Sequence, residues 1–238
     1  MSASENILGY VILFFVFLII IKCYYDNDYF HLKCVVSDVN GKKYCVRERK
    51  NIQKASDLLA NATEKMKHLV EHLESNFSNQ DNVKLLVSNF NPQKIKEILP
   101  TSEYTAYSEN KGEKIAFCLS SVDKKDTDSL IDQNTLMFVA LHELSHLATK
   151  SIGHTQEFWD NFKFILKEAS HIQIYTPIDY KKESQAYCGM DIKDNPYFDK
   201  WCNGWTPCIW FFAWWWCRDH AIWSLQVKRC RMYMLHVI

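Results

Sequence analysis

The chain lacks an excess of charge of either sign. Its 238 residues include 28 lysines and arginines and 28 aspartates and glutamates, so the formal net charge is zero. Proteins that bind nucleic acid through its phosphates usually carry a surplus of basic residues. We therefore predict no nucleic-acid partner.

The chain also lacks any pair of cysteines in CxxC spacing, although nine cysteines are present. Such pairs are typical of zinc fingers and of thioredoxin-like redox sites, so neither class is favoured. The residues that do suggest a chemistry are histidines.

The most informative motif is HELSH at residues 142–146. On an α-helix, residues four apart lie on one face, so His142 and His146 can bind one metal ion at Zn–N distances of about 2.0–2.1 Å. Glu143 can then take a proton from a water that the metal polarises. This is the zincin arrangement for peptide-bond hydrolysis, with Glu143 as the catalytic base.

The flanking sequence predicts that this helix is buried, because apolar residues continue around most of the circumference of residues 135–148. Asp132 or Asn134 can cap its start, and Gly153 can follow its last turn. The alternative is a core helix with two hydrogen-bonded histidines. Buried polar groups need partners, and a metal ion would supply one to both rings.

A third protein ligand is expected, because catalytic zinc sites usually have three protein ligands and a water. His154 is the best candidate, since the glycine before it lets the chain turn back toward the metal. Residues 155–168 then predict a second helix, with Thr155 as its N-cap. Glu157 and Asp160 are alternative ligands, and His154 could instead be a solvated loop histidine.

With Phe158 and Trp159 nearby, this pattern resembles the WLM/SprT-like group of zinc metallopeptidases: HExxH, a short spacer, a third histidine and a nearby phenylalanine. More closely, the chain resembles uncharacterised WLM-like proteins of large DNA viruses, over roughly residues 5–200. The matching stretches are 44–49, 100–107, 187–190 and 195–198. The resemblance implies a Zn²⁺ cofactor bound by the three histidines, Glu143 as the base, and a peptide or protein substrate.

Residues 7–21 form an unbroken apolar or aromatic run. The run is shorter than the ~20 residues of a typical span, but Lys22 can snorkel and Tyr24 and Tyr25 suit a membrane interface. No lysine or arginine precedes it, which argues against a cleaved signal peptide. We predict a single-pass N-terminal membrane anchor.

Cations follow this run, so the positive-inside rule places the catalytic domain on the cytosolic side, where thiols stay reduced. They are Lys22, Lys33, Lys42, Lys43, Arg47, Arg49 and Lys50. In the opposite orientation, Asn61-Ala62-Thr63 and Asn76-Phe77-Ser78 would be glycosylation acceptors.

The remaining patterns predict an α+β fold, a small zincin-like domain with an antiparallel sheet. Helices are expected over 50–74 and 92–99, and a strand over 171–175. A hairpin is expected over 104–119, whose second strand, 114–119, would lie beside the active-site helix. An edge strand there commonly binds the substrate backbone.

A first hairpin is predicted from strands 34–39 and 42–47 around a two-residue turn, Asn40-Gly41. This register places Val36 opposite Cys45. Because Cys34 would then not face Cys45, we predict no disulfide between them.

Tyr180 and Tyr187 are candidates for stabilising the oxyanion, because a phenol can donate a hydrogen bond to developing charge. Either could instead be a packing tyrosine. The predicted domains are an anchor (1–25), a hairpin with linker (26–50), the metallopeptidase domain (51–199) and a tail (200–238).

The tail differs from the rest in composition, since seven of the eight tryptophans follow residue 200. It could lie in a membrane interface or bind a partner. It could also be a translated frameshift, or hold a second metal. The candidate ligands of that metal are Cys202, Cys208, Cys217, His220 and Cys230.

These inferences predict a membrane-anchored, zinc-dependent metallopeptidase. One alternative is a membrane-tethered binding or virion structural protein with a non-catalytic zinc site. Another is a DNA–protein-crosslink protease of the WLM/SprT type, against which the balanced charge and the anchor both count.

Overall fold

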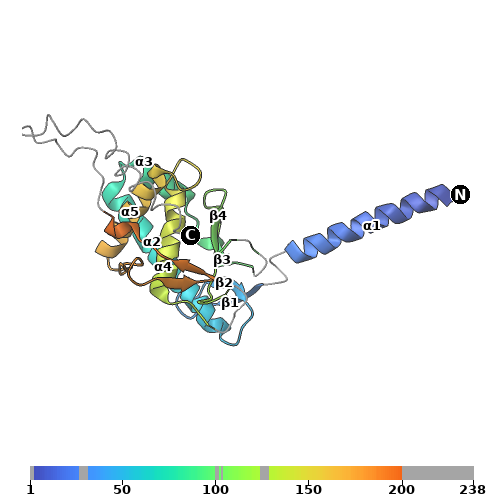
Figure 1. The fold of residues 1–238 in the computed structure, drawn as a ribbon, viewed down its shortest axis with the longest axis horizontal. Coiled ribbons are helices and arrows are strands. Elements are labelled where there is room, and N and C mark those ends of the chain that lie inside the picture. The colour runs from blue at the N-terminus through green and yellow to red at the C-terminus, as the bar shows by residue number, and fades with distance from the viewer. Residues whose placement is uncertain (1–2, 27–31, 100–101, 103, 124–128, 200–238) are drawn as a thin grey trace, which may run out of the picture.

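The computed structural model describes residues 3–26, 32–99, 102, 104–123 and 129–199 (Figure 1). The helices are α1 (Ala3–Asp26), α2 (Ile52–Phe77), α3 (Asp81–Asn89), α4 (Gln133–Leu147) and α5 (Gln156–His171). The strands are β1 (Leu32–Val36), β2 (Lys43–Arg47), β3 (Ile95–Glu97), β4 (Ala106–Glu109), β5 (Lys114–Phe117), β6 (Gln185–Tyr187) and β7 (Met190–Ile192). Two 3-10 turns are η2 (Pro92–Lys94) and η3 (Pro196–Phe198). The predicted α+β class is confirmed, and the predictions for the tail lie outside the described residues.

Helix α4 is the centre of the core, packed against α2, α3 and α5 on one side and β4 and β5 on the other (Figure 1). Its side chains are buried around the whole circumference, as the apolar sequence predicts. Asp132 caps it, because its carboxylate accepts hydrogen bonds from the backbone N–H groups of Asn134 and Thr135 at 2.9 Å each. The helix ends at Leu147, so the prediction that Gly153 follows its last turn is wrong.

The central sheet has the order β3-β5-β4, with β3 parallel and β4 antiparallel to β5. The hairpin predicted over residues 104–119 is confirmed. Its second strand, however, is the middle of the sheet, and β3 and β4 are the two edge strands among the described residues. The helix predicted over 92–99 is wrong beyond Lys94, because Ile95–Glu97 pairs with β5 instead.

The β1–β2 hairpin exists, but its predicted register is wrong. A longer loop joins the strands, in which the Ser37 N–H donates to Lys42 O at 2.9 Å. The Asn40 amide donates to Tyr44 and to Glu64 of α2 rather than organising a two-residue turn. The strands therefore pair Cys34 with Cys45. These two cysteines form a disulfide that the predicted register excluded.

Two further elements differ from the sequence prediction. The strand expected over 171–175 is absent, because α5 runs to His171 and the side chains of Ile174 and Tyr175 are buried without strand pairing. The β6–β7 hairpin is not among the elements predicted from the sequence, and its two turn residues, Cys188 and Gly189, both have positive φ angles, of 54° and 87°.

Helix α1 stands apart from the other elements (Figure 1), and its large apolar side chains from Tyr10 to Ile20 are exposed. Across the part of the chain that the structure describes, no helix meets the length and hydropathy expected of a membrane span. The structure therefore does not support the predicted anchor over residues 7–21, which stays a prediction.

Candidate metal centre

Helix α4 and the loop after it bring three histidines together. His142 and His146 lie one turn apart on α4, and His154 lies at the end of the loop. The ligand nitrogens of these three residues all lie within 4.8 Å of one another. The structure therefore places the sequence-predicted ligands in one cluster, with His142 buried and His154 exposed.

The loop that carries His154 is held by side chains from other elements. Glu157 accepts hydrogen bonds from the backbone N–H groups of Lys150 and Ser151 at 3.1 and 3.2 Å. Asn161 of α5 donates to Ala148 O at 3.1 Å, and Lys111 donates to Thr149 O at 3.0 Å. The predicted cap of α5 is confirmed, since Thr155 Oγ1 accepts from the Phe158 N–H. These bonds fix the position of the third imidazole before any metal binds.

The three imidazoles fit a single tetrahedral metal ion. Their ring centres form a triangle whose three sides are each 5.0 Å. A zinc ion bound at about 2.0–2.1 Å by three imidazoles at tetrahedral angles would place their ring centres roughly 5 Å apart, with neighbouring ligand atoms about 3.3 Å apart. The Nε2 atoms of His142 and His154 are 3.1 Å apart, close to that spacing.

Aromatic rings of α5 form the floor of this cluster. The Phe158 ring centre lies 4.9, 4.3 and 4.8 Å from those of His142, His146 and His154. Trp159 lies 5.6 Å from His154. This apolar floor limits the rotation of the imidazoles and keeps water from their inner side, so the donor atoms face the open side of the site.

Burial keeps the three imidazoles neutral. It lowers the pKa of His142 well below the usual value and, with the charge of His154, lowers the pKa of His146 to about 4. Burial also lowers the pKa of His154. Neutral imidazoles have a free lone pair for a metal, so the environment favours ligation near neutral pH.

The same shifts predict how the metal-free protein responds to acid. Between pH 6.5 and about 4 the unfolded chain protonates His146 and the folded chain does not, so stability is present above pH 6.5 and is lost as the pH falls. The pKa of Glu143 is raised to about 7 by burial and opposes this trend, but three histidines outweigh one carboxyl. Denaturant titrations of chelator-treated protein at pH 7 and pH 5 should show a drop in unfolding free energy. The drop should be smaller in His146→Gln, and equal drops in the two proteins would contradict the argument.

Glu143 and the three histidines line an open cleft of about 1110 Å³. The Glu143 side chain is buried, and the hydroxyl of Ser108 on β4 donates a hydrogen bond that partly offsets the rise in its pKa. Ser108 has no distinctive pattern around it in the sequence, so its contact with Glu143 emerges only from the pairing of β4 with β5.

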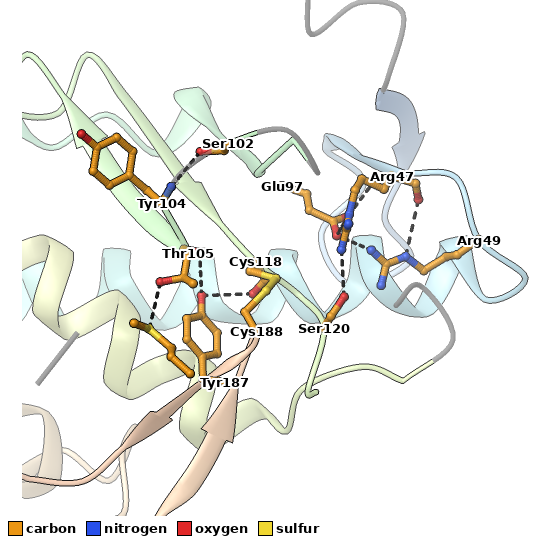
Figure 2. The surroundings of a disulfide bond; sticks show 11 residues. Arg47, Arg49, Glu97, Ser102, Tyr104, Thr105, Cys118, Ser120, Tyr187 and Cys188 are labelled. Carbon is orange, nitrogen blue, oxygen red and sulfur yellow. Dashed lines mark hydrogen bonds and ion pairs between the residues drawn. A yellow bond between two sulfur atoms is a disulfide. The ribbon is translucent and has the colours of Figure 1, made fainter. Parts of the chain in front are cut away.

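One wall of the cleft is the edge strand β4, and another is the β6–β7 turn at Cys188, Gly189 and Met190. Cys188 forms a disulfide with Cys118, which directly follows β5 (Figure 2). The Tyr187 hydroxyl lies 3.2 Å from both Thr105 O and Cys118 O. Because it has a single proton, it donates to one of these carbonyl oxygens at a time. The turn is therefore bound to the central sheet covalently as well as by hydrogen bonds.

Replacing this disulfide by Cys118→Ser/Cys188→Ser should lower the unfolding free energy by about 4 kcal/mol, because it closes a separation of 70 residues. The Cys34–Cys45 disulfide provides the comparison, because it spans a separation of only 11 residues. Its replacement by Cys34→Ser/Cys45→Ser should lower the unfolding free energy by about 3 kcal/mol. Denaturant unfolding without reductant measures both. A Cys118→Ser/Cys188→Ser protein as stable as its parent would refute the assignment.

The remaining candidate residues lie elsewhere. Tyr187 is fully buried and bonded to the backbone, and Tyr180 is buried against Phe138, so neither lines the cleft. Their burial argues against an oxyanion role. Glu157 bonds to the loop backbone, and Asp160 accepts from Gln156, so neither joins the histidine cluster.

No family model matches the chain. It is 32% identical over 166 residues to "Uncharacterized protein R325" of Acanthamoeba polyphaga mimivirus, covering 68% of this chain and 82% of that protein. It is also 40% identical over 67 residues to "Uncharacterized protein 136R" of Invertebrate iridescent virus 6, covering 28% of this chain and 36% of that protein.

Among solved structures, two crystal structures of Wss1 from Saccharomyces cerevisiae, one of them a mutant, align with TM-scores of 0.41 and 0.42. They are 17% and 16% identical, cover 53% and 54% of this chain, and are themselves covered over 84% and 88%. TM-scores below 0.5 do not establish a shared fold. The match to the mimivirus protein does establish kinship, so the chain belongs to the family of viral proteins that includes that mimivirus protein.

Proposed function

We propose that the chain is a zinc-dependent metallopeptidase, in which three histidines hold the metal and Glu143 is the catalytic base. One observation carries the proposal: the triangle of imidazoles with 5.0 Å sides, beside a buried glutamate in an open cleft. Zn²⁺ bound there would polarise a scissile carbonyl and lower the pKa of the attacking water toward 7.

Glu143 supplies the proton transfer. Its carboxylate accepts the proton of the attacking water and then passes it to the leaving amine. Its raised pKa of about 7 suits both halves of that cycle, since the group can hold and release a proton near neutrality. The Ser108 hydroxyl orients the carboxylate from the side of β4.

The cleft suits an extended peptide. β4 is an edge strand of the described sheet and lines the cleft, so its outer backbone groups can pair with a substrate strand. A peptide added there would run between β4 and α4, with its scissile bond above the three histidines. The β6–β7 turn bounds the cleft and so limits the size of the substrate side chains that the cleft accepts.

The proposal is tested by incubating the purified full chain with an unfolded protein substrate at pH 7.5, with and without a zinc chelator. Cleavage that the chelator abolishes and added Zn²⁺ restores is the expected result. Absence of cleavage by the zinc-loaded chain, with a histidine-bound metal present, would favour the alternative of a binding or virion structural protein with a non-catalytic site.

A DNA–protein-crosslink protease would use the same residues and differ in its substrate. The balanced charge of 28 cationic and 28 acidic residues favours a substrate without DNA. Adding single-stranded DNA to the same assay separates the two. We expect that the DNA does not change the cleavage rate. A cleavage rate that the DNA raises severalfold, with added salt removing the increase, would instead support the crosslink protease.

We further propose that α1 tethers the domain to a membrane, supported by the exposed apolar side chains from Tyr10 to Ile20. The two disulfides alter the orientation that we favour. Reducing compartments keep thiols free, so Cys34–Cys45 and Cys118–Cys188 favour an oxidising compartment over the cytosolic side expected from the flanking cations. In that orientation the exposed Asn61 and Asn76 would be glycosylated, and a mass unchanged by endoglycosidase after expression in eukaryotic cells would argue against it.

A further inference from the structure

A second group of metal-ligating side chains lies between α2 and α5. His72 of α2 and Glu168 and His171 of α5 each offer a ligand atom, and these atoms all lie within 4.8 Å of one another. Residues 168 and 171 lie roughly 20 Å along α5 from the start of that helix, next to which His154 lies in the preceding loop. The two groups are therefore separate sites.

The geometry of the group fits one small divalent ion. His72 Nε2 is 3.1 Å from Glu168 Oε2, close to the roughly 3.3 Å between neighbouring ligands of a tetrahedral zinc ion. Glu168 and His171 are three residues apart and so share a face of α5. The ring centres of His72 and His171 are 6.2 Å apart, and His171 is exposed, so a small rotation of its ring brings its nitrogen to the ion.

The surroundings restrict the two inner ligands. The side chains of His72 and Glu168 are 18% and 19% exposed. The ring centre of Phe77 lies 6.3 Å from that of His72 and 5.2 Å from that of Phe164. The Asn76 amide lies 3.2 Å from Nδ1, the other ring nitrogen of His72. The same amide donates to the His72 carbonyl oxygen at 2.8 Å, so Asn76 packs beside the ring.

An ion pair between protonated His72 and Glu168 is the simpler explanation of part of this group. It accounts for two of the three residues and gives His171 no function. A divalent cation bound by Glu168 and both imidazoles would use all three side chains as ligands.

We propose that His72, Glu168 and His171 bind a second divalent transition-metal ion, with Zn²⁺ as the probe. Nitrogen and carboxylate ligands suit such ions, and water completes the coordination. The ion links α2 to α5 and so stabilises the helix whose first turn packs under the catalytic histidines. The site does not depend on the proposed peptidase activity.

The test counts zinc equivalents bound by the full chain in detergent, by equilibrium dialysis followed by elemental analysis. His171→Ala should bind one equivalent fewer than its parent, with an affinity for that equivalent at least ~10-fold weaker. His68→Ala is the matched control, since His68 is exposed one turn earlier on α2 and should leave the count unchanged.

Because His171 is an exposed last residue of α5, its replacement should leave the fold intact, and circular dichroism checks this. Thermal unfolding adds a second readout: zinc should raise the Tm of the His68→Ala protein more than that of the His171→Ala protein. Equal zinc counts in His171→Ala and the parent would overturn the proposal. Failure of the catalytic proposal would instead appear as equal counts in His146→Ala and the parent.

Discussion

Glu143→Gln should keep its bound zinc and lose peptide hydrolysis by about 10²–10⁴-fold. The amide matches the carboxylate in size and can still accept a hydrogen bond from Ser108, so the fold and the three histidines should be unaffected. It cannot take a proton from the attacking water, and the leaving amine would then have no proton donor. The measurement is kcat/KM on a fluorogenic peptide, with zinc content determined on the same samples.

Glu71→Gln is the control for this variant, because Glu71 is an exposed glutamate on α2. Its activity should match that of the parent. A Glu143→Gln protein that hydrolyses the peptide within threefold of the parent would remove Glu143 from the mechanism. A Glu143→Gln protein that does not retain its zinc would show that Glu143 acts on metal binding instead.

Glu97→Gln should lower the unfolding free energy by about 3–5 kcal/mol. Glu97 is fully buried, and its carboxylate accepts hydrogen bonds from the backbone N–H and the Nε of Arg47 at 2.7 Å each, and from Arg49 (Figure 2). Arg47 also donates to Ser120 at 2.8 Å. The network joins β2 to β3, and the substitution would leave two guanidinium groups buried without a carboxylate.

The exposed pair of Lys33 and Glu48, 3.5 Å apart, provides the comparison. Glu48→Gln should change the unfolding free energy by less than about 1 kcal/mol, because water screens exposed ion pairs. Denaturant unfolding of both variants measures the difference. A similar small loss in both proteins would show that the buried network does not stabilise the fold.

The sequence predicts the helix-borne part of the site because helical spacing is local. Residues four apart share a face, so His142 and His146 follow from the motif alone, and Asp132 and Thr155 are recognisable as helix caps. His154 is also predictable from a glycine and a following cap. The loop that holds it depends on Asn161 and Lys111, which are distant in sequence.

The rest of the site depends on pairings between distant segments. The register of β1–β2 follows from the bonds of Asn40 to Tyr44 and Glu64, which no two-residue turn rule includes. The cleft wall at Cys188 and Gly189 forms a short hairpin with little alternation of apolar and polar residues. Ile95–Glu97 resembles a helical end in sequence, and pairing with β5 makes it a strand.

The central claim is that His142, His146 and His154 hold one metal ion. Its most direct test is the zinc content of the full chain and of His146→Ala after dialysis against the same low concentration of free zinc, with His68→Ala as the control. We predict one equivalent fewer in His146→Ala than in the parent, and no change in His68→Ala. Equal zinc contents in His146→Ala and the parent would contradict the claim.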